Sequence, residues 1–309
     1  MKRRIPGMII KNISATSSIF FVILFLFYGT SYAQICDPLA LDSIGNPGEY
    51  NVGSLTESDG IRNGPDYRGA TIYYPTNASP PYSGISIVPG YWSAKSYIQN
   101  WGPFLASHGI VTMIIGTNSI WELPEARRDA LLDALETLKG ENTRSGSPLL
   151  EQLDVNSLAV GGWSMGGGGA QLAAVADPSI KAVLALCPWL RSRKLTPSDI
   201  NHAAPILFFS AENDCIAPPA SHADVQYDYT LQSTSKMLFE ISGGRHKAAN
   251  DPMNGGEYVG KIALSWLKHY LVGDTCYCPL VLDTPPPASK YLLNVKCSSL
   301  SSVGDVIRD

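Results

Sequence analysis

The residues most capable of chemistry in this sequence surround a serine, Ser164. It lies at the centre of a Gly-Trp-Ser-Met-Gly stretch, residues 162–166, that fits the pattern G-x-S-x-G. An apolar run precedes this stretch and a run of small residues follows it, so we expect a sharp strand-to-helix turn that exposes the serine hydroxyl. The alternative is a glycine-rich turn without catalytic function. A phosphate-binding loop is improbable because the Lys-Ser/Thr pair that it requires is absent.

A serine hydroxyl is a weak nucleophile and needs a general base, oriented in turn by an acid. After such a turn, the acid and then the histidine are expected along the chain, each just after a strand. Asp214 follows an apolar run and is the better acid, with Glu212 as the alternative. His246 follows the next apolar run and lies downstream of both acids. We therefore predict the triad Ser164, Asp214 and His246.

The same turn predicts where an oxyanion would be stabilised. One donor is the backbone N–H of Met165, the residue after the nucleophile, at the positive end of the following helix. The second donor is expected in the loop after the predicted strand 85–88, at the N–H of Tyr91. Serine attack on an ester or amide carbonyl is the chemistry that such donors assist.

Strands and helices that could position these residues alternate along the chain. Strands are predicted at residues 70–74, 85–88, 110–115, 157–161, 181–186, 205–210 and 236–241, and helices at 96–108, 124–139, 166–176, 225–231 and 258–271. Several strands are apolar throughout, which is typical of strands that are buried on both faces. The alternation predicts an α/β fold with a mostly parallel, twisted sheet flanked by helices.

The chain is expected to contain one catalytic domain. Residues 1–33 combine early basic residues, a ten-residue apolar run and a small-x-small site ending at Ala33, which predicts a signal peptide. The apolar run is too short to span a bilayer, although a short N-terminal anchor is the alternative. Residues 34–297 then form a single domain, and residues 298–309 are predicted to be a disordered tail.

Charge and cysteine content limit the possible partners. The full chain has 23 basic and 27 acidic residues, and the leader holds four of the basic ones, which leaves a mature net charge of −8. We therefore predict a secreted monomer that binds neither nucleic acid nor membranes stably. Six cysteines in an exported protein favour disulfides. The Cys-x-Cys pair at 276 and 278 has no histidine at zinc spacing, so neither a metal nor another cofactor is expected.

Several motifs give the sequence a family resemblance. They are Gly-Trp-Ser-Met-Gly-Gly-Gly-Gly at 162–169, Pro-Gly-Tyr at 89–91, Trp-Gly-Pro-Phe-Leu-Ala-Ser-His-Gly at 101–109, Thr-Asn-Ser at 117–119, Cys-Pro-Trp at 187–189, Glu-Asn-Asp at 212–214 and Gly-Gly-x-His at 243–246. Together they closely resemble the PET-degrading hydrolases and their bacterial cutinase relatives. The resemblance implies an α/β-hydrolase fold without a lid, and an ester hydrolase that cleaves polyesters through an acyl-enzyme on Ser164.

The resemblance also implies a substrate subsite. Its members would be Tyr91, Met165, Trp189 and Ile216, with Tyr91 and Trp189 on either side of the scissile ester. Further residues expected to bind substrate are Trp92, Trp163 and His222.

Other positions give mixed signals about the subgroup. Trp163 resembles the PET-hydrolase type, whereas His222 resembles the cutinase type and Gln226 replaces an aliphatic residue. Ala211 and Ala248 stand where the PET-hydrolase type has an additional disulfide.

The disulfide pairing is expected by analogy with the family. The resemblance implies a C-terminal bridge between Cys278 and Cys297. Cys36 and Cys276 are a further possible pair, and Cys187 and Cys215 are expected to stay free.

Two alternatives to a polyester hydrolase remain open. A general carboxylesterase or lipase with incidental polyester activity would use the same triad. A catalytically silent binding module is disfavoured by the intact set of Ser164, Asp214 and His246.

Overall fold

The computed structural model of the chain describes Met1, Cys36, residues 40–190, residues 195–295 and Cys297. Apart from Met1, the predicted signal peptide lies outside the described residues, as does the predicted tail 298–309. The export and tail predictions therefore remain predictions.

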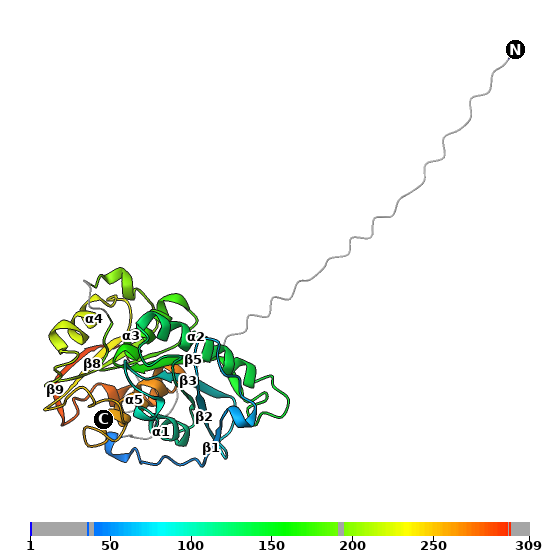
Figure 1. The fold of residues 1–309 in the computed structure, drawn as a ribbon, viewed down its shortest axis with the longest axis horizontal. Coiled ribbons are helices and arrows are strands. Elements are labelled where there is room, and N and C mark those ends of the chain that lie inside the picture. Colours follow the sequence, from blue (N-terminus) through cyan, green and yellow to red (C-terminus); the bar gives the residue numbers. More distant parts are fainter. Residues whose placement is uncertain (2–35, 37–39, 191–194, 296, 298–309) are drawn as a thin grey trace. The chain divides into compact units, whose positions relative to one another are not determined.

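A single mostly parallel sheet organises the described residues (Figure 1). Its nine described strands lie in the order β1-β2-β4-β3-β5-β6-β7-β8-β9. Their bounds are β1 Val52–Leu55, β2 Ala70–Pro75, β3 Tyr82–Val88, β4 Val111–Ile115, β5 Leu153–Trp163, β6 Val183–Leu186, β7 Ile206–Ala211, β8 Lys236–Ile241 and β9 Ala288–Asn294. Strands β3 to β8 pair in parallel, whereas β1, β2 and β9 pair antiparallel with their neighbours. This confirms the predicted fold class.

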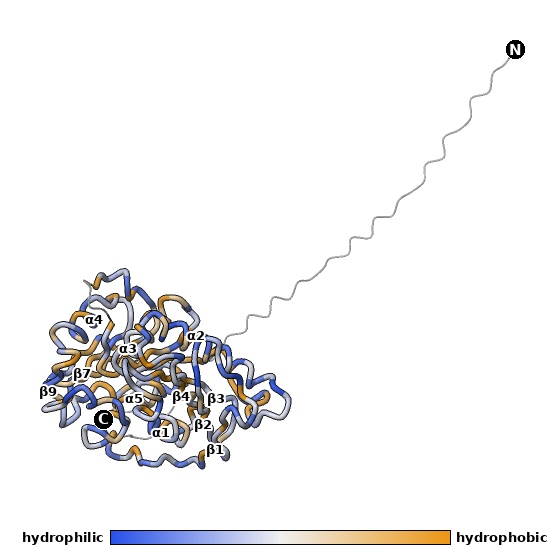
Figure 2. Tube along the Cα trace, viewed as in Figure 1, coloured by the Kyte–Doolittle hydropathy of each residue, from blue (hydrophilic) through white to orange (hydrophobic). Residues whose placement is uncertain are grey.

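Helices cover both faces of the sheet. They are α1 Trp101–Ser107, α2 Pro124–Glu141, α3 Met165–Ala176, α4 Ala223–Tyr229 and α5 Tyr258–Leu267. Side chains of the central strands alternate between two apolar cores, so that Leu184 and Leu186 join one core and Val183 joins the other. Helices α1 and α5 close the first core, and α2 and α3 close the second. Figure 2 shows the hydrophobic residues gathered in the strands between these layers.

Some element boundaries differ from the sequence predictions. The predicted helix 96–108 is a short 3-10 turn, Lys95–Tyr97, followed by α1. Pro103 lies in the first turn of α1, the position where a helix tolerates a residue without an N–H, so the helix cannot extend back to residue 96. The helix predicted at 225–231 begins and ends two residues earlier, as α4.

Two strands at the edges were not predicted. Strand β1 has only four residues. Strand β9 follows the Pro-rich stretch 284–287 and pairs with β8, where most of its residues are partly exposed. A disulfide between Cys36 and Cys276 and another between Cys278 and Cys297 secure this C-terminal segment. Cys187 is buried and free, and Cys215 is exposed and free.

Candidate active site

The backbone at Ser164 forms the sharp turn that the G-x-S-x-G pattern predicts. Ser164 lies between β5 and α3 with φ 58° and ψ −121°, a conformation that is unfavourable for a residue with a side chain. A Cβ atom at Gly162 would lie 2.2 Å from the carbonyl carbon of Gly166. The two glycines on either side of the serine, Gly162 and Gly166, therefore cannot be replaced by larger residues without a clash. Local strain and close backbone packing thus hold the hydroxyl at the carboxyl edge of the sheet.

Three side chains from three strand ends form one hydrogen-bonded line. The Nε2 atom of His246 lies 2.8 Å from the Oγ atom of Ser164, and its Nδ1 atom lies 2.7 Å from Oδ2 of Asp214. All three side chains are buried. The loops after β5, β7 and β8 supply them, and parallel strands bring these loops to one edge of the sheet.

The environment of Asp214 keeps this residue ionised. Burial raises the pKa of Asp214, but the hydrogen bond from His246 and those from the backbone N–H groups of Ala217 and Ile216 outweigh burial and leave the pKa lowered. An ionised carboxylate fixes the proton of His246 on Nδ1, so Nε2 can accept the proton of Ser164.

The alternative acid is placed differently. Glu212 is exposed, and its Oε2 atom accepts hydrogen bonds from the N–H of Gly243 at 2.7 Å and from the hydroxyl of Ser242 at 3.2 Å. The structure therefore brings Asp214, and not Glu212, to His246.

The loop after β3 lies directly against the serine. A Cβ atom at Gly90 would lie 2.7 Å from the Cβ of Ser164, so the loop backbone and the serine are in close contact at Gly90. Tyr91 is the next residue in this loop. Within the described part of the chain, the N–H groups of Tyr91 and Met165 have no hydrogen-bond partner. Both donors are thus available beside Ser164 for a developing oxyanion.

A buried arginine that the sequence analysis did not single out supports this loop. Arg127 of α2 is completely buried, and its Nη1 atom donates to the carbonyl oxygen of Pro89 at 2.7 Å. Burial lowers the pKa of Arg127 to about 10, which still leaves it charged at neutral pH. A signal was present in the sequence, because Arg127 lies four residues before Leu131 on the apolar face of the helix.

Three of the predicted subsite residues lie at or near the surface. Tyr91 is 42% exposed, Ile216 is 60% exposed and Trp189 is half-buried. The backbone N–H of Trp189 donates to the carbonyl oxygen of Ser164 at 2.9 Å, which fixes Trp189 next to the serine. The ring of His222 packs on Trp189 with centroids 5.8 Å apart.

Trp163 lies beneath the site and not on its surface. It is 4% exposed, and its Nε1 atom donates to the carbonyl oxygen of His246 at 2.9 Å. Its ring packs between those of Tyr97 and His246, at 6.0 Å and 5.1 Å between centroids. Trp163 therefore supports His246 through its ring and its Nε1–H, and its contact with substrate stays a prediction.

Comparison with known proteins places the chain in a family. A family model described as PET hydrolase-like matches residues 32–297. The chain belongs to the PET hydrolase-like family. The bis(hydroxyethyl) terephthalate hydrolase of Streptomyces coelicolor is 35% identical over 242 residues, which cover 78% of this chain and 74% of that protein. Cutinase 1 of Thermobifida cellulosilytica is 33% identical over 237 residues, 77% of this chain and 84% of that protein.

Membership of the PET hydrolase-like family confirms two sequence predictions. The fold is that of an α/β-hydrolase, and the protein is a carboxylic ester hydrolase. Among the described residues, no group of three His, Cys, Asp or Glu side chains is arranged to hold a metal ion. No helix in that same part of the chain is both long enough and apolar enough to cross a membrane.

Proposed function

We propose that this protein hydrolyses polyesters, including aromatic polyesters of terephthalate, through an acyl-enzyme on Ser164. The observation that carries the proposal is the continuous line of hydrogen bonds from Asp214 through His246 to Ser164. The substrate class is supported by the names of two relatives, a bis(hydroxyethyl) terephthalate hydrolase and a cutinase.

The reaction proceeds in two halves. Oγ of Ser164 attacks the ester carbonyl while Nε2 of His246 takes the hydroxyl proton, and Asp214 stabilises the resulting imidazolium. The N–H groups of Tyr91 and Met165 bind the oxyanion of the tetrahedral intermediate. When the intermediate collapses, the proton passes from His246 to the departing alcohol. Water then repeats the attack on the acyl-enzyme and releases the acid.

The surface around Ser164 suits a chain that cannot enter a deep pocket. Tyr91, Trp189 and Ile216 offer exposed or half-exposed apolar groups on the loops after β3, β6 and β7, and Met165, which follows the serine, is half-buried. Aromatic rings bind flat diacid rings by offset or edge-to-face contact, which adds about 0.5–1.5 kcal/mol beyond area burial. A segment of polymer can therefore lie along the surface with its ester at Ser164.

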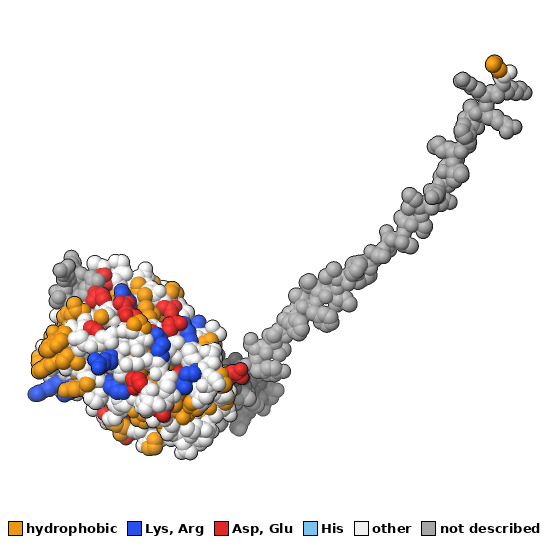
Figure 3. Space-filling view, turned by 45° about the vertical axis from the view of Figure 1, so that its right-hand side comes forward, with side chains coloured by type: hydrophobic (Ala, Val, Ile, Leu, Met, Phe, Trp, Pro, Cys, Tyr) orange, Lys and Arg blue, Asp and Glu red, His pale blue; other side chains and the backbone are white. Residues whose placement is uncertain are grey.

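We also propose that the protein is exported, cleaved after Ala33 and active as a monomer with one domain, residues 34–297. The two disulfides support an oxidising compartment. On the face shown in Figure 3, acidic and basic side chains are interspersed, with no single-sign patch that would attract nucleic acid. Mass spectrometry of protein from the medium should give a chain beginning at Gln34, and a retained leader would refute this part.

The main experiment replaces the serine. Ser164→Ala should reduce hydrolysis of polyester film and of a short nitrophenyl ester by at least about 1,000-fold, because the nucleophile is lost. Ser198→Ala, at an exposed serine of the 3-10 helix Pro197–Ile200, is the matched control and should keep full activity. Comparable activity in a folded Ser164→Ala protein would overturn the proposal. Preference for emulsified long-chain triglyceride over film would instead favour a general lipase.

A further inference from the structure

Two exposed tryptophans lie side by side next to the site. Trp92 is 69% exposed and Trp121 is 57% exposed. Their rings are stacked, with centroids 6.2 Å apart and an interplanar angle of 16°. The ring of Tyr91 meets Trp121 edge-to-face at 5.5 Å. The aromatic surface that begins at Tyr91, beside Ser164, thus continues outward over two indoles.

The local backbone holds this pair of tryptophans, here called the indole pair, in place. The N–H of Trp92 donates to the carbonyl oxygen of Ile120 at 2.7 Å, and Arg127 donates to the same oxygen at 3.4 Å. The φ of Trp92 is 54°, a strained value for a residue with a side chain. Strain at an exposed aromatic residue next to an active site suggests that its position serves binding.

We propose that the indole pair is a second aromatic subsite, which binds the ring of the neighbouring repeat unit when an aromatic polyester chain has its scissile ester at Ser164. The inference rests on the proposed function and deepens it. A polyester ring is the expected ligand because the indole pair adjoins Tyr91, whose N–H is the proposed oxyanion donor, so that a bound polymer chain would continue from the site onto the pair. This expectation also follows from chemistry, because two stacked indoles leave flat apolar faces in water that a flat ring covers best.

Trp121 is the residue to test, because it joins Tyr91 to Trp92 and has no predicted role in bond cleavage. The binding experiment uses the Ser164→Ala protein, so that ligands stay intact, and measures affinities by calorimetry. The two probes are ethylene glycol bis(terephthalate), which has two rings joined by the diol, and mono(2-hydroxyethyl) terephthalate, which has one. Adding Trp121→Ala should lower the ratio of two-ring to one-ring affinity roughly two- to tenfold.

Matched variants separate aromatic stacking from other effects. Trp121→Phe should keep most of the ratio, whereas Trp121→Leu, which is apolar but has no ring, should lose as much as alanine does. Leu282→Ala removes a similarly exposed apolar group, 44% exposed, from the C-terminal segment and should leave the ratio unchanged. Thermal unfolding of each variant shows whether the fold is intact.

The outcomes are distinct. An unchanged ratio in Trp121→Ala, or full retention in Trp121→Leu, would overturn the aromatic subsite. Loss of a concentration-dependent dimer in Trp121→Ala, measured by sedimentation, would show that the indole pair is an interface between copies. Hydrolysis of the ligands by Ser164→Ala would count against Ser164 as the nucleophile, which is part of the proposed function. The ratio of two-ring to one-ring affinity tests the aromatic subsite independently of that result.

Discussion

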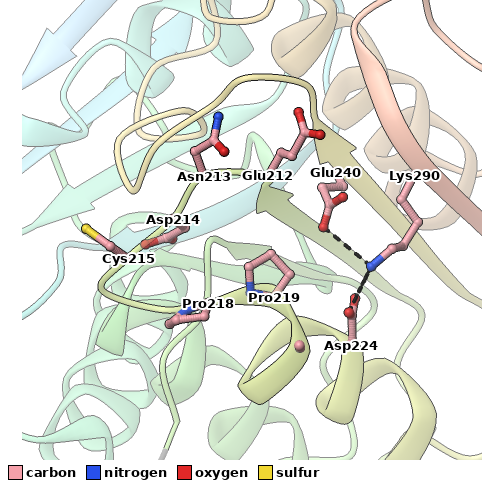
Figure 4. Close-up of a pocket in the computed structure, with 10 residues that line it drawn as sticks. Glu212, Asn213, Asp214, Cys215, Pro218, Pro219, Asp224, Glu240 and Lys290 are labelled. Carbon is pink, nitrogen blue, oxygen red and sulfur yellow. Dashed lines mark hydrogen bonds and ion pairs between the residues drawn. The ribbon is translucent and has the colours of Figure 1, made fainter.

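Asp214 stands between two regions of different character. On one side lie His246, Ser164 and a surface of exposed aromatic rings. On the other lies a pocket of about 560 Å³, and five of the ten residues that line it are charged (Figure 4). There Nζ of Lys290 lies 2.8 Å from a carboxylate oxygen of Asp224 and 3.5 Å from one of Glu240.

The two regions differ in whether their polar groups already have a hydrogen-bond or ion-pair partner. In the pocket, the ammonium group of Lys290 already has ion-pair partners in Asp224 and Glu240, and the free thiol of Cys215 also lines the pocket. On the Ser164 side, the N–H groups of Tyr91 and Met165 have no partner among the described residues. A concave shape is the usual first guess for a binding site. Here unpaired donors and an aligned nucleophile identify the site better than concavity does.

The largest expected effect contrasts the two sides of Asp214 directly. Asp214→Asn should reduce the kcat for a nitrophenyl ester by about 10,000-fold, because the amide cannot fix the tautomer of His246. Lys290→Met, which removes the cation of the pocket, should change kcat by less than about threefold, since partly exposed ion pairs contribute little. A loss in Lys290→Met as great as that in Asp214→Asn would show that the pocket takes part in catalysis.

A smaller effect is expected from the buried arginine. Arg127→Met should lower kcat by about tenfold, because the loop that carries Tyr91 loses the hydrogen bond from Arg127 to the carbonyl oxygen of Pro89. This loss is smaller than that expected when an oxyanion donor is removed outright. Stability should also fall by about 1–3 kcal/mol, since a buried carbonyl is left without a donor. Arg128→Met, at the neighbouring, partly exposed arginine, is the control. If kcat of Arg127→Met is unchanged below its unfolding temperature, Arg127 has only a structural role.

The two sides of Asp214 should also respond to opposite extremes of pH. The pKa of Asp214 is lowered on folding, so its contribution to stability is complete above about pH 4, the unfolded value, and is lost as pH falls further. Burial lowers the pKa of Lys290, but the hydrogen bonds and the negative charges of Asp224 and Glu240 together outweigh burial, and the pKa is raised. That contribution is complete below about pH 10.4 and is lost as pH rises further.

Urea unfolding across pH measures both contributions. The stability difference between the native chain and Asp214→Asn should shrink in acid, and the difference from Lys290→Met should shrink in alkali. Differences that do not vary with pH would contradict the assigned pairings.

The smallest effect is expected for the alternative acid. Glu212→Gln should change kcat by less than about twofold, because Glu212 bonds to Gly243 and Ser242 and makes no contact with His246. A loss close to that of Asp214→Asn would reverse the assignment of the acid.

The sequence was most informative where strand ends and chemistry coincide. Ser164, Asp214 and His246 each follow an apolar strand, and parallel pairing brings such positions together whatever the loops do. The burial of Trp163 was not predicted, although its alternation with Ala159 in β5, both in one core, could have shown it. Trp121 lies in an irregular loop without periodicity, and β9 is a half-exposed edge strand, so neither carries a strong local signal.

The central claim is that Ser164 is the nucleophile, and covalent labelling tests it most directly. A fluorophosphonate should add once per chain, and peptide mapping should place the adduct on Ser164, with activity lost in proportion to labelling. Under the same conditions His246→Ala should label far more slowly, because the hydroxyl has lost its base. Full esterase activity in a chain whose Ser164 is completely labelled would contradict the account.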